Sequence, residues 1–241
     1  MADTGALTRL RDILLHSDNI VFFGGAGVST ESGIPDFRGS GGLYNTKYAY
    51  PPETILSHSF FISNTSEFYR FYWDKMLYPG AKPNKAHLAL AKLEKQGKVR
   101  AVITQNIDDL HTRAGSVHVL ELHGSVTRNT CMACKKQYPL DVILQAAGVP
   151  LCSCGGIIKP DVVLYGEGLD QRVMNDAARA IQAAGVLVVG GTSLNVYPAA
   201  GLINYFNGHT LILINQSETP YDSRADIVIR ESIGQTLGTV L

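Results

Sequence analysis

Four cysteines form two close pairs in the second half of the chain, and the sequence contains no others. Two residues separate Cys131 from Cys134, 17 residues follow, and one residue separates Cys152 from Cys154. Two close pairs suit a tetrahedral zinc ion bound by four thiolates, which stabilises a fold and leaves no open position for chemistry. A disulfide framework is typical of small secreted chains, so the alternatives are a redox dithiol or inert thiols.

Other polar groups follow four short apolar segments. They are Gln105, Asn106, Ile107 and Asp108 after one segment, His123 after the second, Gly191, Thr192 and Ser193 after the third, and Asn215 after the fourth. Taken singly, Asn106 and Asp108 are explained equally well as helix caps. Ser193 is explained as a turn residue, and His123 as a hydrogen-bonded structural histidine. Because such groups recur at strand ends of one predicted sheet, we expect a shared ligand site.

A glycine-rich turn follows the first apolar segment, at Gly24-Gly25-Ala26-Gly27-Val28-Ser29-Thr30. A strand, a glycine turn and a helix form the plan of a dinucleotide site, because glycines allow backbone N–H groups to approach a pyrophosphate. Thr30 stands at the third glycine of G-x-G-x-x-G, and no acidic residue for the ribose follows at the usual distance. The pattern therefore argues against a hydride-transferring dehydrogenase and leaves open a nucleotide bound in another pose.

The elements that must position these residues alternate between strands and helices. Short β-branched or aromatic runs predict buried parallel strands at residues 19–23, 99–104, 117–122, 186–189 and 210–214. Helical spacing is found at Leu7, Leu10, Leu14 and Leu15, at Val173, Ala177, Ile181 and Ala184, and at His87, Leu88, Leu90, Ala91 and Leu93. This alternation predicts an α/β fold with a doubly wound parallel sheet, whose ligands bind beyond the carboxyl ends of the strands.

Two stretches interrupt the alternation. Residues 35–83 are rich in aromatic side chains, and residues 125–158 contain the cysteines. Aromatic side chains are usually buried, so we interpret the first stretch as core rather than as a ligand site. Both stretches are interpreted as insertions that form a second domain. The predicted large domain comprises residues 1–36, 81–124 and 159–241, and the small domain comprises residues 37–80 and 125–158.

The composition narrows the class of protein. The 241 residues are 45% hydrophobic, an ordinary globular value that excludes a wholly disordered chain. Lysine plus arginine and aspartate plus glutamate number 21 each, so bulk charge gives no support for a nucleic acid or an anionic membrane as partner. No apolar run has the length of a membrane span, and residues 1–15 lack a secretion signal. Together with the clustered cysteines, this favours a cytoplasmic location.

Long motifs of this chain resemble those of the sirtuins, the NAD-dependent protein lysine deacylases, and the short chain resembles the bacterial members. The motifs are Gly25-Ala26-Gly27-Val28-Ser29, Ser32-Gly33-Ile34-Pro35-Asp36-Phe37-Arg38-Gly39, Thr104-Gln105-Asn106-Ile107-Asp108, His123-Gly124, the four cysteines, Tyr165-Gly166-Glu167, Gly191-Thr192-Ser193-Leu194 and Asn215. They occur in the family's order, from residue 20 to about residue 230.

The resemblance implies a Rossmann-like large domain and a small zinc-binding domain, with NAD and an acyl-lysine peptide in the cleft between them. It implies that nicotinamide leaves NAD, that the acyl oxygen attacks the ribose, and that the acyl group passes to the 2′-hydroxyl. The products would be lysine, nicotinamide and O-acyl-ADP-ribose. Acetylated-lysine proteins or peptides are the implied partners, NAD is the implied co-substrate, and zinc is the implied structural ion.

The resemblance also implies roles for single residues. His123 would be the general base for the ribose hydroxyl, since imidazole titrates near neutral pH. Asn106 would orient the ribose and a water, and Asp108 would accept from the nicotinamide carboxamide. The implied NAD contacts are Gly25, Ala26, Gly27, Thr30, Asp36, Phe37, Arg38, Gln105, Asn106, Ile107, Asp108, His123, Gly191, Thr192, Ser193, Asn215 and Ile233. The implied peptide contacts, which would pair with the substrate as an added strand, are Val162, Tyr165, Gly166, Glu167, Val196 and Tyr197.

Several positions depart from the family's pattern. Gly24 stands where threonine is common, and Asp109 stands where glycine is common. Desuccinylating members carry Tyr-x-x-Arg, whereas Tyr69-Arg70-Phe71-Tyr72 places a tyrosine at the position of that arginine. Without this cation an acidic acyl group lacks a partner, so we expect acetyl or other uncharged acyl groups.

The sequence leaves three alternative functions to weigh. The same NAD cleft could transfer ADP-ribose to a protein, and no residue excludes this reaction. A catalytically silent NAD-sensing or interaction module predicts a replaced His123 or Asn106, and both are present. A DNA-binding zinc ribbon is disfavoured, because the cations near the cysteines are few and the chain is neutral.

Overall fold

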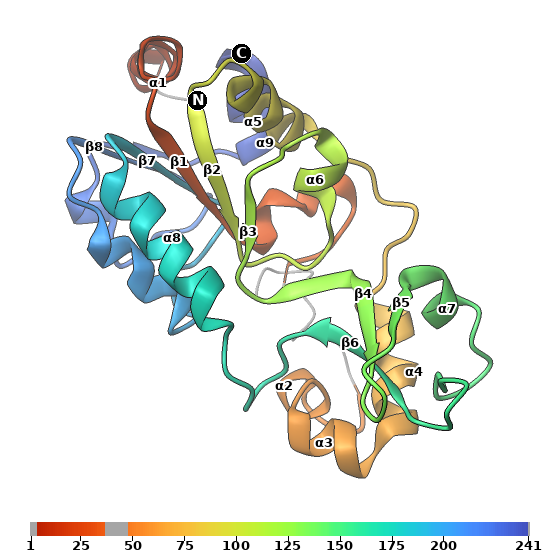
Figure 1. Ribbon diagram of the computed structural model, residues 1–241. Helices are drawn as coiled ribbons and strands as arrows, with labels where there is room; N and C mark the ends of the chain where they lie inside the picture. Colours follow the sequence, from red (N-terminus) through yellow and green to blue (C-terminus); the bar gives the residue numbers. More distant parts are fainter. Residues whose placement is uncertain (1–3, 37–47, 241) are drawn as a thin grey trace.

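The computed structural model describes residues 4–36 and 48–240, and within them the larger of two sheets is parallel throughout (Figure 1). Its strand order is β3-β2-β1-β7-β8-β9. The bounds are β1 Ile20–Gly24, β2 Val99–Thr104, β3 Val119–Glu121, β7 Val186–Gly190, β8 Thr210–Ile214 and β9 Ile227–Ile229. The chain order reverses between β1 and β7, and in open α/β sheets ligands bind beyond the carboxyl ends of the strands at such a point.

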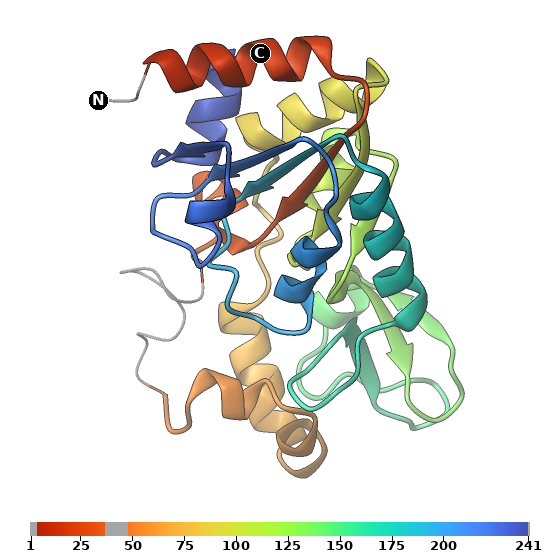
Figure 2. The same ribbon diagram turned by 90° about the vertical axis from the view of Figure 1, so that its left-hand side faces the viewer.

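Helices cover both faces of this sheet. On one face lie α1 (Thr4–His16), α5 (Lys85–Lys95) and α9 (Ile233–Val240); on the other lie α8 (Gln171–Ala183) and the 3-10 helix η4 (Ala199–Tyr205) (Figure 2). Side chains alternate along a strand, so Ile20 and Phe22 of β1 enter the first core and Val21 and Phe23 enter the second. Burial on both faces explains the continuous apolar runs that predicted these strands.

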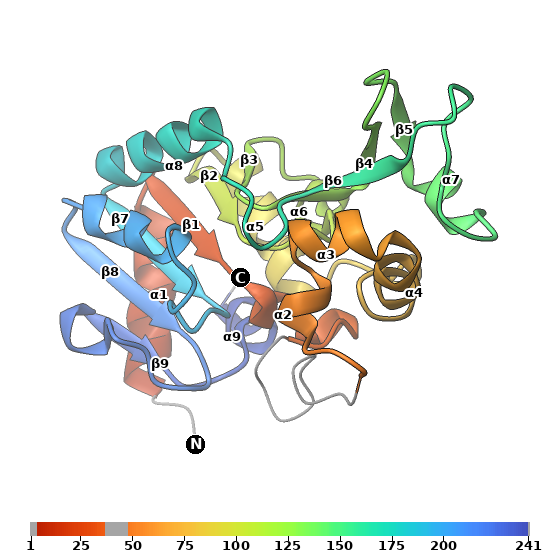
Figure 3. The ribbon, with the colours of Figure 1, turned by 90° about the horizontal axis from the view of Figure 1, so that it is seen from below.

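A smaller antiparallel sheet lies beside the first, with the order β5-β4-β6. Its strands are β4 Gly124–Cys131, β5 Gln137–Pro139 and β6 Ile158–Val162. The helices around it are α2 (Pro52–Ile55), α3 (His58–Ser63), α4 (Thr65–Lys75) and α7 (Leu140–Leu144). Residues of the sheet and the helices share a third core. These elements lie together to one side of the parallel sheet (Figure 3).

The aromatic stretch is core, as predicted. Phe61, Phe68, Tyr69 and Tyr72 are fully buried in the third core. The rings of Phe61 and Phe68 meet edge to face with centroids 4.8 Å apart, a favourable geometry for aromatic pairs. The Tyr69 hydroxyl donates to the carbonyl of Ile158 in β6, so the helices and the small sheet are joined by a polar contact as well.

Two predictions about elements need correction. The strand expected over residues 117–122 is limited to β3, because the N–H groups of Val117 and His118 donate to the Glu94 carboxylate and Val117 is 90% exposed. Two 3-10 turns, η1 (Ala26–Val28) and η2 (Thr30–Ser32), occupy the place of the helix expected after the glycine turn.

Strand β9 of the parallel sheet was not predicted, because its three residues form no long apolar run. Leu15, placed with Leu10 and Leu14 on one face of α1, is 37% exposed at the edge of that face. The short helix α6 (Leu110–Ala114) follows the predicted polar segment after β2.

None of the helices in the described part of the chain is long and apolar enough to cross a membrane.

Candidate active site

A cavity of about 900 Å³ opens at the carboxyl ends of the parallel strands. This volume lies within the range of small-molecule and cofactor sites. The predicted residues that line it are Gly25, Ala26, Gly27, Thr30, Asp36, Gln105, Asn106, Ile107, Asp108, His123, Val162, Tyr165, Gly166, Glu167, Gly191, Thr192, Ser193, Val196, Tyr197, Asn215 and Ile233. Phe37 and Arg38 lie outside the described residues. The structure therefore brings together every described residue that the sequence assigned to NAD or peptide.

The glycine turn and the loop after β7 pack against each other at one side of the cavity. Gly27 N donates to the carbonyl of Gly191 at 2.8 Å. A Cβ on Gly27 would lie 2.8 Å from the Cα of Gly191, and a Cβ on Gly191 would lie 2.4 Å from the Val28 nitrogen. Any larger residue would push the loops apart, so the backbone approach requires glycine at both positions.

A buried hydrogen-bond chain connects this turn to the segment after β2. Asn106 Nδ2 donates to Ser29 Oγ at 3.0 Å, and Ser29 Oγ donates to Asp108 Oδ2 at 2.6 Å. Leu110 N donates to the other carboxylate oxygen, Asp108 Oδ1, at 2.9 Å. Burial raises the pKa of Asp108, and the hydrogen bond from Ser29 opposes that rise. These hydrogen bonds hold the Asn106 amide and the Asp108 carboxylate in place at the cavity wall.

Ser29 is a functional candidate that the residue-by-residue assignment missed. It is 1% exposed and joins Asn106 to Asp108, although it was absent from the predicted contact set. Its place inside the quoted glycine motif was the available signal. Its two partners lie 77 and 79 residues away along the chain, so its role as a connector was visible in the fold alone.

His123 lies between β3 and β4 with one ring nitrogen held. Its Nδ1 lies 2.9 Å from the carbonyl oxygen of Gln105. A carbonyl oxygen accepts but cannot donate, so Nδ1 carries the proton of the neutral ring and Nε2 is the basic nitrogen. Burial lowers the pKa of His123, and the hydrogen bond to Gln105 partly offsets this effect. The imidazole is therefore neutral and able to accept a proton near pH 7.

Three further hydrogen bonds position the loop after β7 and the segment after β9. Gln105 Nε2 donates to Thr192 Oγ1 at 3.1 Å, which joins the segment after β2 to the segment after β7. Glu31 was also missed by the sequence reading. Its carboxylate accepts from Gly234 N at 2.6 Å and from Ser232 Oγ at 3.2 Å, at the start of α9. These bonds place Ile233 at the edge of the cavity.

The segment after β6 has one backbone edge already paired. Tyr165 N donates to the Leu56 carbonyl at 3.0 Å, and His58 N donates to the Tyr165 carbonyl at 2.9 Å. The Glu167 carboxylate accepts from Leu164 N at 2.9 Å and from Lys159 Nζ at 3.1 Å, and it contacts His58 Nδ1 at 2.8 Å. Burial raises the pKa of Glu167, but these partners outweigh burial and leave the pKa below its usual value.

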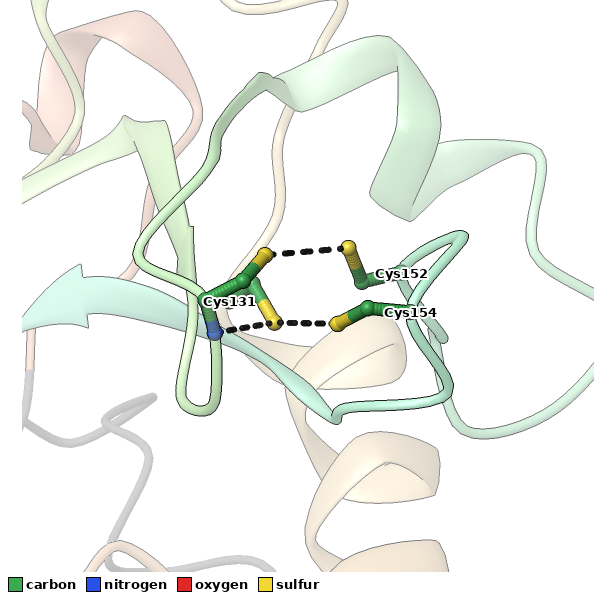
Figure 4. A group of neighbouring side chains, drawn as sticks. Cys131, Cys152 and Cys154 are labelled. Atoms are coloured by element: carbon green, nitrogen blue, oxygen red, sulfur yellow. Dashed lines mark hydrogen bonds between the residues drawn. The ribbon is translucent and has the colours of Figure 1, made fainter.

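The four cysteines come together from two turns (Figure 4). All four sulfurs lie within 4.8 Å of one another, with Cys131 Sγ 3.6 Å from Cys154 Sγ and Cys134 Sγ 3.5 Å from Cys152 Sγ. Four thiolates at about 2.3 Å from a central zinc ion are separated by roughly 3.8 Å, so the cluster fits such an ion. A Cβ on Gly156 would lie 2.8 Å from Cys131 Sγ, so the second turn requires glycine beside the cluster.

The stretch used to predict acyl preference lies in α4. Tyr69 and Tyr72 are buried in the third core, and burial raises the pKa of Tyr72 well above its usual value. Arg70 is exposed and pairs with Glu67 of the same helix. Lys75, at the end of α4, is a cation that lines the cavity. The preference for uncharged acyl groups stays a prediction.

The chain is similar to proteins of one known family over nearly its whole length. The model of the Sir2 family matches residues 25–198 of this chain. A NAD-dependent protein deacetylase of Clostridium acetobutylicum is 56% identical over 239 residues, which cover 98% of each chain. A NAD-dependent protein deacetylase of Staphylococcus aureus is 46% identical over 229 residues, which cover 94% of each chain.

Solved structures give the same result. A complex of Sir2 with a p53 peptide and NAD+ has a TM-score of 0.85 and 42% identity, over 97% of this chain and 96% of that chain. Sir2 bound to an acetylated peptide has a TM-score of 0.86 and 40% identity, over 97% and 96% of the two chains. A Sir2 complex with a deacetylated p53 peptide and 3′-O-acetyl-ADP-ribose has a TM-score of 0.88 and 42% identity, over 96% and 95%.

Proposed function

This chain belongs to the Sir2 family, and from that premise we propose that it removes acetyl groups from protein lysines while consuming NAD. The reaction converts acetyl-lysine, NAD and water into lysine, nicotinamide and O-acetyl-ADP-ribose. The observation that carries the proposal is the cavity of about 900 Å³, because it is lined both by the glycine turn and by the segments assigned to an acetylated peptide. A cofactor and a peptide can therefore meet beside one histidine.

We assign the general-base role to Nε2 of His123. The contact between Nδ1 and the Gln105 carbonyl leaves Nε2 unprotonated in the neutral ring, and the lowered pKa keeps the ring neutral near pH 7. Removing a proton from the ribose hydroxyl would make that oxygen a better acceptor for the acyl group. The imidazolium formed in this step would be stabilised by the same carbonyl oxygen.

Asn106 and Asp108 are assigned to orientation of the NAD substrate. Their side chains are connected through Ser29, so their positions are set before any ligand arrives. Asn106 contributes hydrogen-bonding groups without charge, which suits a ribose hydroxyl or a water. Asp108 contributes an acceptor, which suits the N–H groups of the nicotinamide carboxamide. Several other predicted NAD contacts line the cavity beyond the ends of β1, β7 and β8, namely Gly25, Ala26, Gly27, Gly191, Thr192, Ser193 and Asn215.

The peptide is assigned to the segments Val162–Glu167 and Val196–Tyr197, which line the same cavity. Backbone pairing with an extended substrate gives affinity with little demand on its sequence. The pairing of Tyr165 with Leu56 and His58 fixes one edge of the first segment. We therefore expect broad tolerance of the residues around the acetyl-lysine, and a preference for uncharged acyl groups.

The cysteine cluster is assigned a structural role. Cys131, Cys134, Cys152 and Cys154 would hold zinc with all four positions filled, so the ion would stabilise the turns beside β4 and β6. We propose the domain division given by the sequence, with residues 37–80 and 125–158 as the small domain, except that the pairing of β6 with β4 extends the second segment to Val162. We also propose a cytoplasmic location, because closely paired cysteines suited to a metal are typical of a reducing compartment.

Mass spectrometry of an acetyl-lysine peptide incubated with the protein, with and without NAD, tests the proposal. We expect the peptide to lose the acetyl mass only when NAD is present, and nicotinamide and O-acetyl-ADP-ribose to form at the same time. Consumption of NAD with an unchanged peptide would overturn it in favour of ADP-ribosyl transfer or NAD hydrolysis. A succinyl-lysine peptide cleaved faster than its acetyl counterpart would contradict the predicted acyl preference.

A further inference from the structure

His123 lies in a two-residue connection between the two sheets. Strand β3 of the parallel sheet ends at Glu121, and strand β4 of the antiparallel sheet begins at Gly124. Leu122 N donates to the Thr104 carbonyl at 2.9 Å, and Val163 N donates to the His123 carbonyl at 3.0 Å. The connection is thus fixed to β2 on one side and to the segment after β6 on the other.

An ion pair spans this connection. Arg128 of β4 donates through its guanidinium nitrogen to Glu121 Oε2 at 2.6 Å. The Glu121 side chain is 14% exposed, whereas the Arg128 side chain is 51% exposed. Because Glu121 belongs to the parallel sheet and Arg128 to the antiparallel sheet, the pair joins the two sheets on either side of His123.

Asp109 is a second acid that faces Arg128. It stands where the family commonly has glycine, and its φ of 64° is in the left-handed region that glycine adopts most easily. Burial raises the pKa of Asp109 and of Glu121, and the positive charge of Arg128 lowers both. Arg113 also lowers the pKa of Asp109. The positive charge of Arg128 therefore compensates two acids at the junction of the sheets, one directly before α6 and one at the end of β3.

We propose that the Glu121–Arg128 ion pair positions His123 for proton transfer by setting the angle of the β3–β4 connection. This inference rests on the proposed function, in which His123 is the general base. The Gln105 carbonyl contacts the imidazole at Nδ1. This single contact orients the ring, and the backbone of the β3–β4 connection determines where the ring lies. A general base must lie within hydrogen-bond reach of its proton, and a misplacement of about 1 Å can lower a rate by roughly 100-fold.

The order of the reaction steps distinguishes a misplaced His123 from a general loss of stability, because the two defects change different rates. Nicotinamide leaves NAD before the ribose hydroxyl loses its proton, so exchange of labelled nicotinamide into NAD does not require His123. Formation of O-acetyl-ADP-ribose does require it. A misplaced His123 should therefore lower product formation while exchange continues, whereas loss of folded protein lowers both rates equally.

The test compares Arg128→Gln with Arg128→Lys in the full zinc-containing chain, with an acetyl-lysine peptide and labelled nicotinamide. For Arg128→Gln we expect product formation to fall about tenfold and exchange to stay within about twofold, consistent with a sub-ångström shift of the base. Arg128→Lys keeps the cation beside Glu121 and should recover most of the rate. The matched control is Arg179→Gln, whose ion pair with Asp176 lies within α8; both of its rates should equal those of the unmodified chain.

Glu121→Gln provides the second arm, and it carries the test if Arg128→Gln does not fold. It should show the same partition, and the double variant Glu121→Gln/Arg128→Gln should lose no more than the worse single variant, because both changes remove one interaction. Equal loss of exchange and product, or additive losses in the double variant, would overturn the positioning role and leave deacetylation standing. An unmodified chain that catalyses neither reaction would overturn the proposed function and, with it, this inference.

Discussion

Among single residues, His123 is the side chain whose removal separates the chemical steps most clearly. We predict that His123→Ala lowers O-acetyl-ADP-ribose formation by about 10²–10⁴-fold, the usual effect of losing a general base. Nicotinamide exchange should continue, because that step precedes proton transfer. Paired assays of both rates check this, with His16→Ala on the exposed end of α1 as control. Near-normal product formation would remove His123 from the proposed role.

The ionisation of the same histidine predicts a pH profile. A general base acts in its neutral form, and burial lowers the pKa of His123 below the ordinary value of about 6.5. Half of the His123 side chains are therefore protonated only at a pH below that value, so kcat/KM should decline on acidification with a midpoint below about pH 6.5. A pH titration of product formation at subsaturating peptide measures this limb. A midpoint above about pH 6.5 would contradict the lowered pKa.

Ser29 gives a further prediction, because it connects two residues assigned to NAD. Ser29→Ala removes a donor from the buried Asp108 and an acceptor from Asn106. Leaving a buried polar group unpaired costs about 1–3 kcal/mol, so we expect kcat/KM for NAD to fall about tenfold or more. The KM for peptide should change much less. Steady-state kinetics with each substrate varied in turn, with Ser63→Ala on α3 as control, decide the point.

Among the elements, those buried on both faces could be predicted from the sequence. β1 and β7 are buried throughout and have continuous apolar runs, and β2 is interrupted only by the exposed Arg100. The ends of these strands fall within a residue or two of the prediction. β9 was missed because a three-residue edge strand needs its neighbour β8 to be recognised. Val117 looked like a strand residue, but the Glu94 carboxylate holds its backbone outside the sheet.

The candidate site shows the same division between local and long-range information. Residues such as Asn106, His123 and Asn215 could be found because they follow strands directly, and strand ends meet at one edge of a parallel sheet. Glu31 could not be found in this way. Its partners at Ser232 and Gly234 lie about 200 residues away, so its contact depends on the packing of α9 rather than on any local pattern.

The turns that carry the cysteines give a prediction at this scale. Cys131→Ser removes a buried sulfur ligand, and structural zinc contributes folding energy. We expect loss of bound zinc and a lower thermal midpoint, as the third core loses its link between β4 and the turn before β6. Metal analysis and thermal unfolding, with and without a chelator, measure both. Unchanged zinc content together with an unchanged midpoint would contradict a structural site.

Considered as a whole molecule, the chain places its cavity among separate apolar cores. Two cores lie on opposite faces of the parallel sheet, and the third lies between the small sheet and helices α2–α4. The cavity is lined from both sheets, by Gly25 and Thr192 on one side and by Val126 and Val162 on the other. Packing within the cores therefore fixes the shape of each cavity wall. The distance and angle between the two walls depend on the segments that connect the sheets.

Two buried histidines beside the first core couple the stability of the whole molecule to pH, and the ring of one of them, His111, lies 6.0 Å from that of Phe22. His87 of α5 and His111 of α6 are buried with ring centroids 4.7 Å apart. No atom of the described residues hydrogen-bonds to either ring nitrogen of His111. Burial lowers the pKa of His87 to about 4. Burial, together with the neighbouring His87, lowers the pKa of His111 to about 3.

Both folded-state pKa values lie below the unfolded value of about 6.5, so the unfolded chain binds protons first as the pH falls. Stability is therefore lost from about pH 6.5 down to about pH 4 through His87 and down to about pH 3 through His111. Each histidine contributes a loss of about 2 kcal/mol at pH 5. His111→Leu removes one of these groups together with its unpaired nitrogens, so the fall in thermal midpoint between pH 7 and pH 5 should shrink by about 4–8 °C. His16→Leu, at the exposed end of α1, should keep the full fall. Thermal unfolding of the three proteins at both pH values measures the difference, and an undiminished fall in His111→Leu would show that other groups control acid stability.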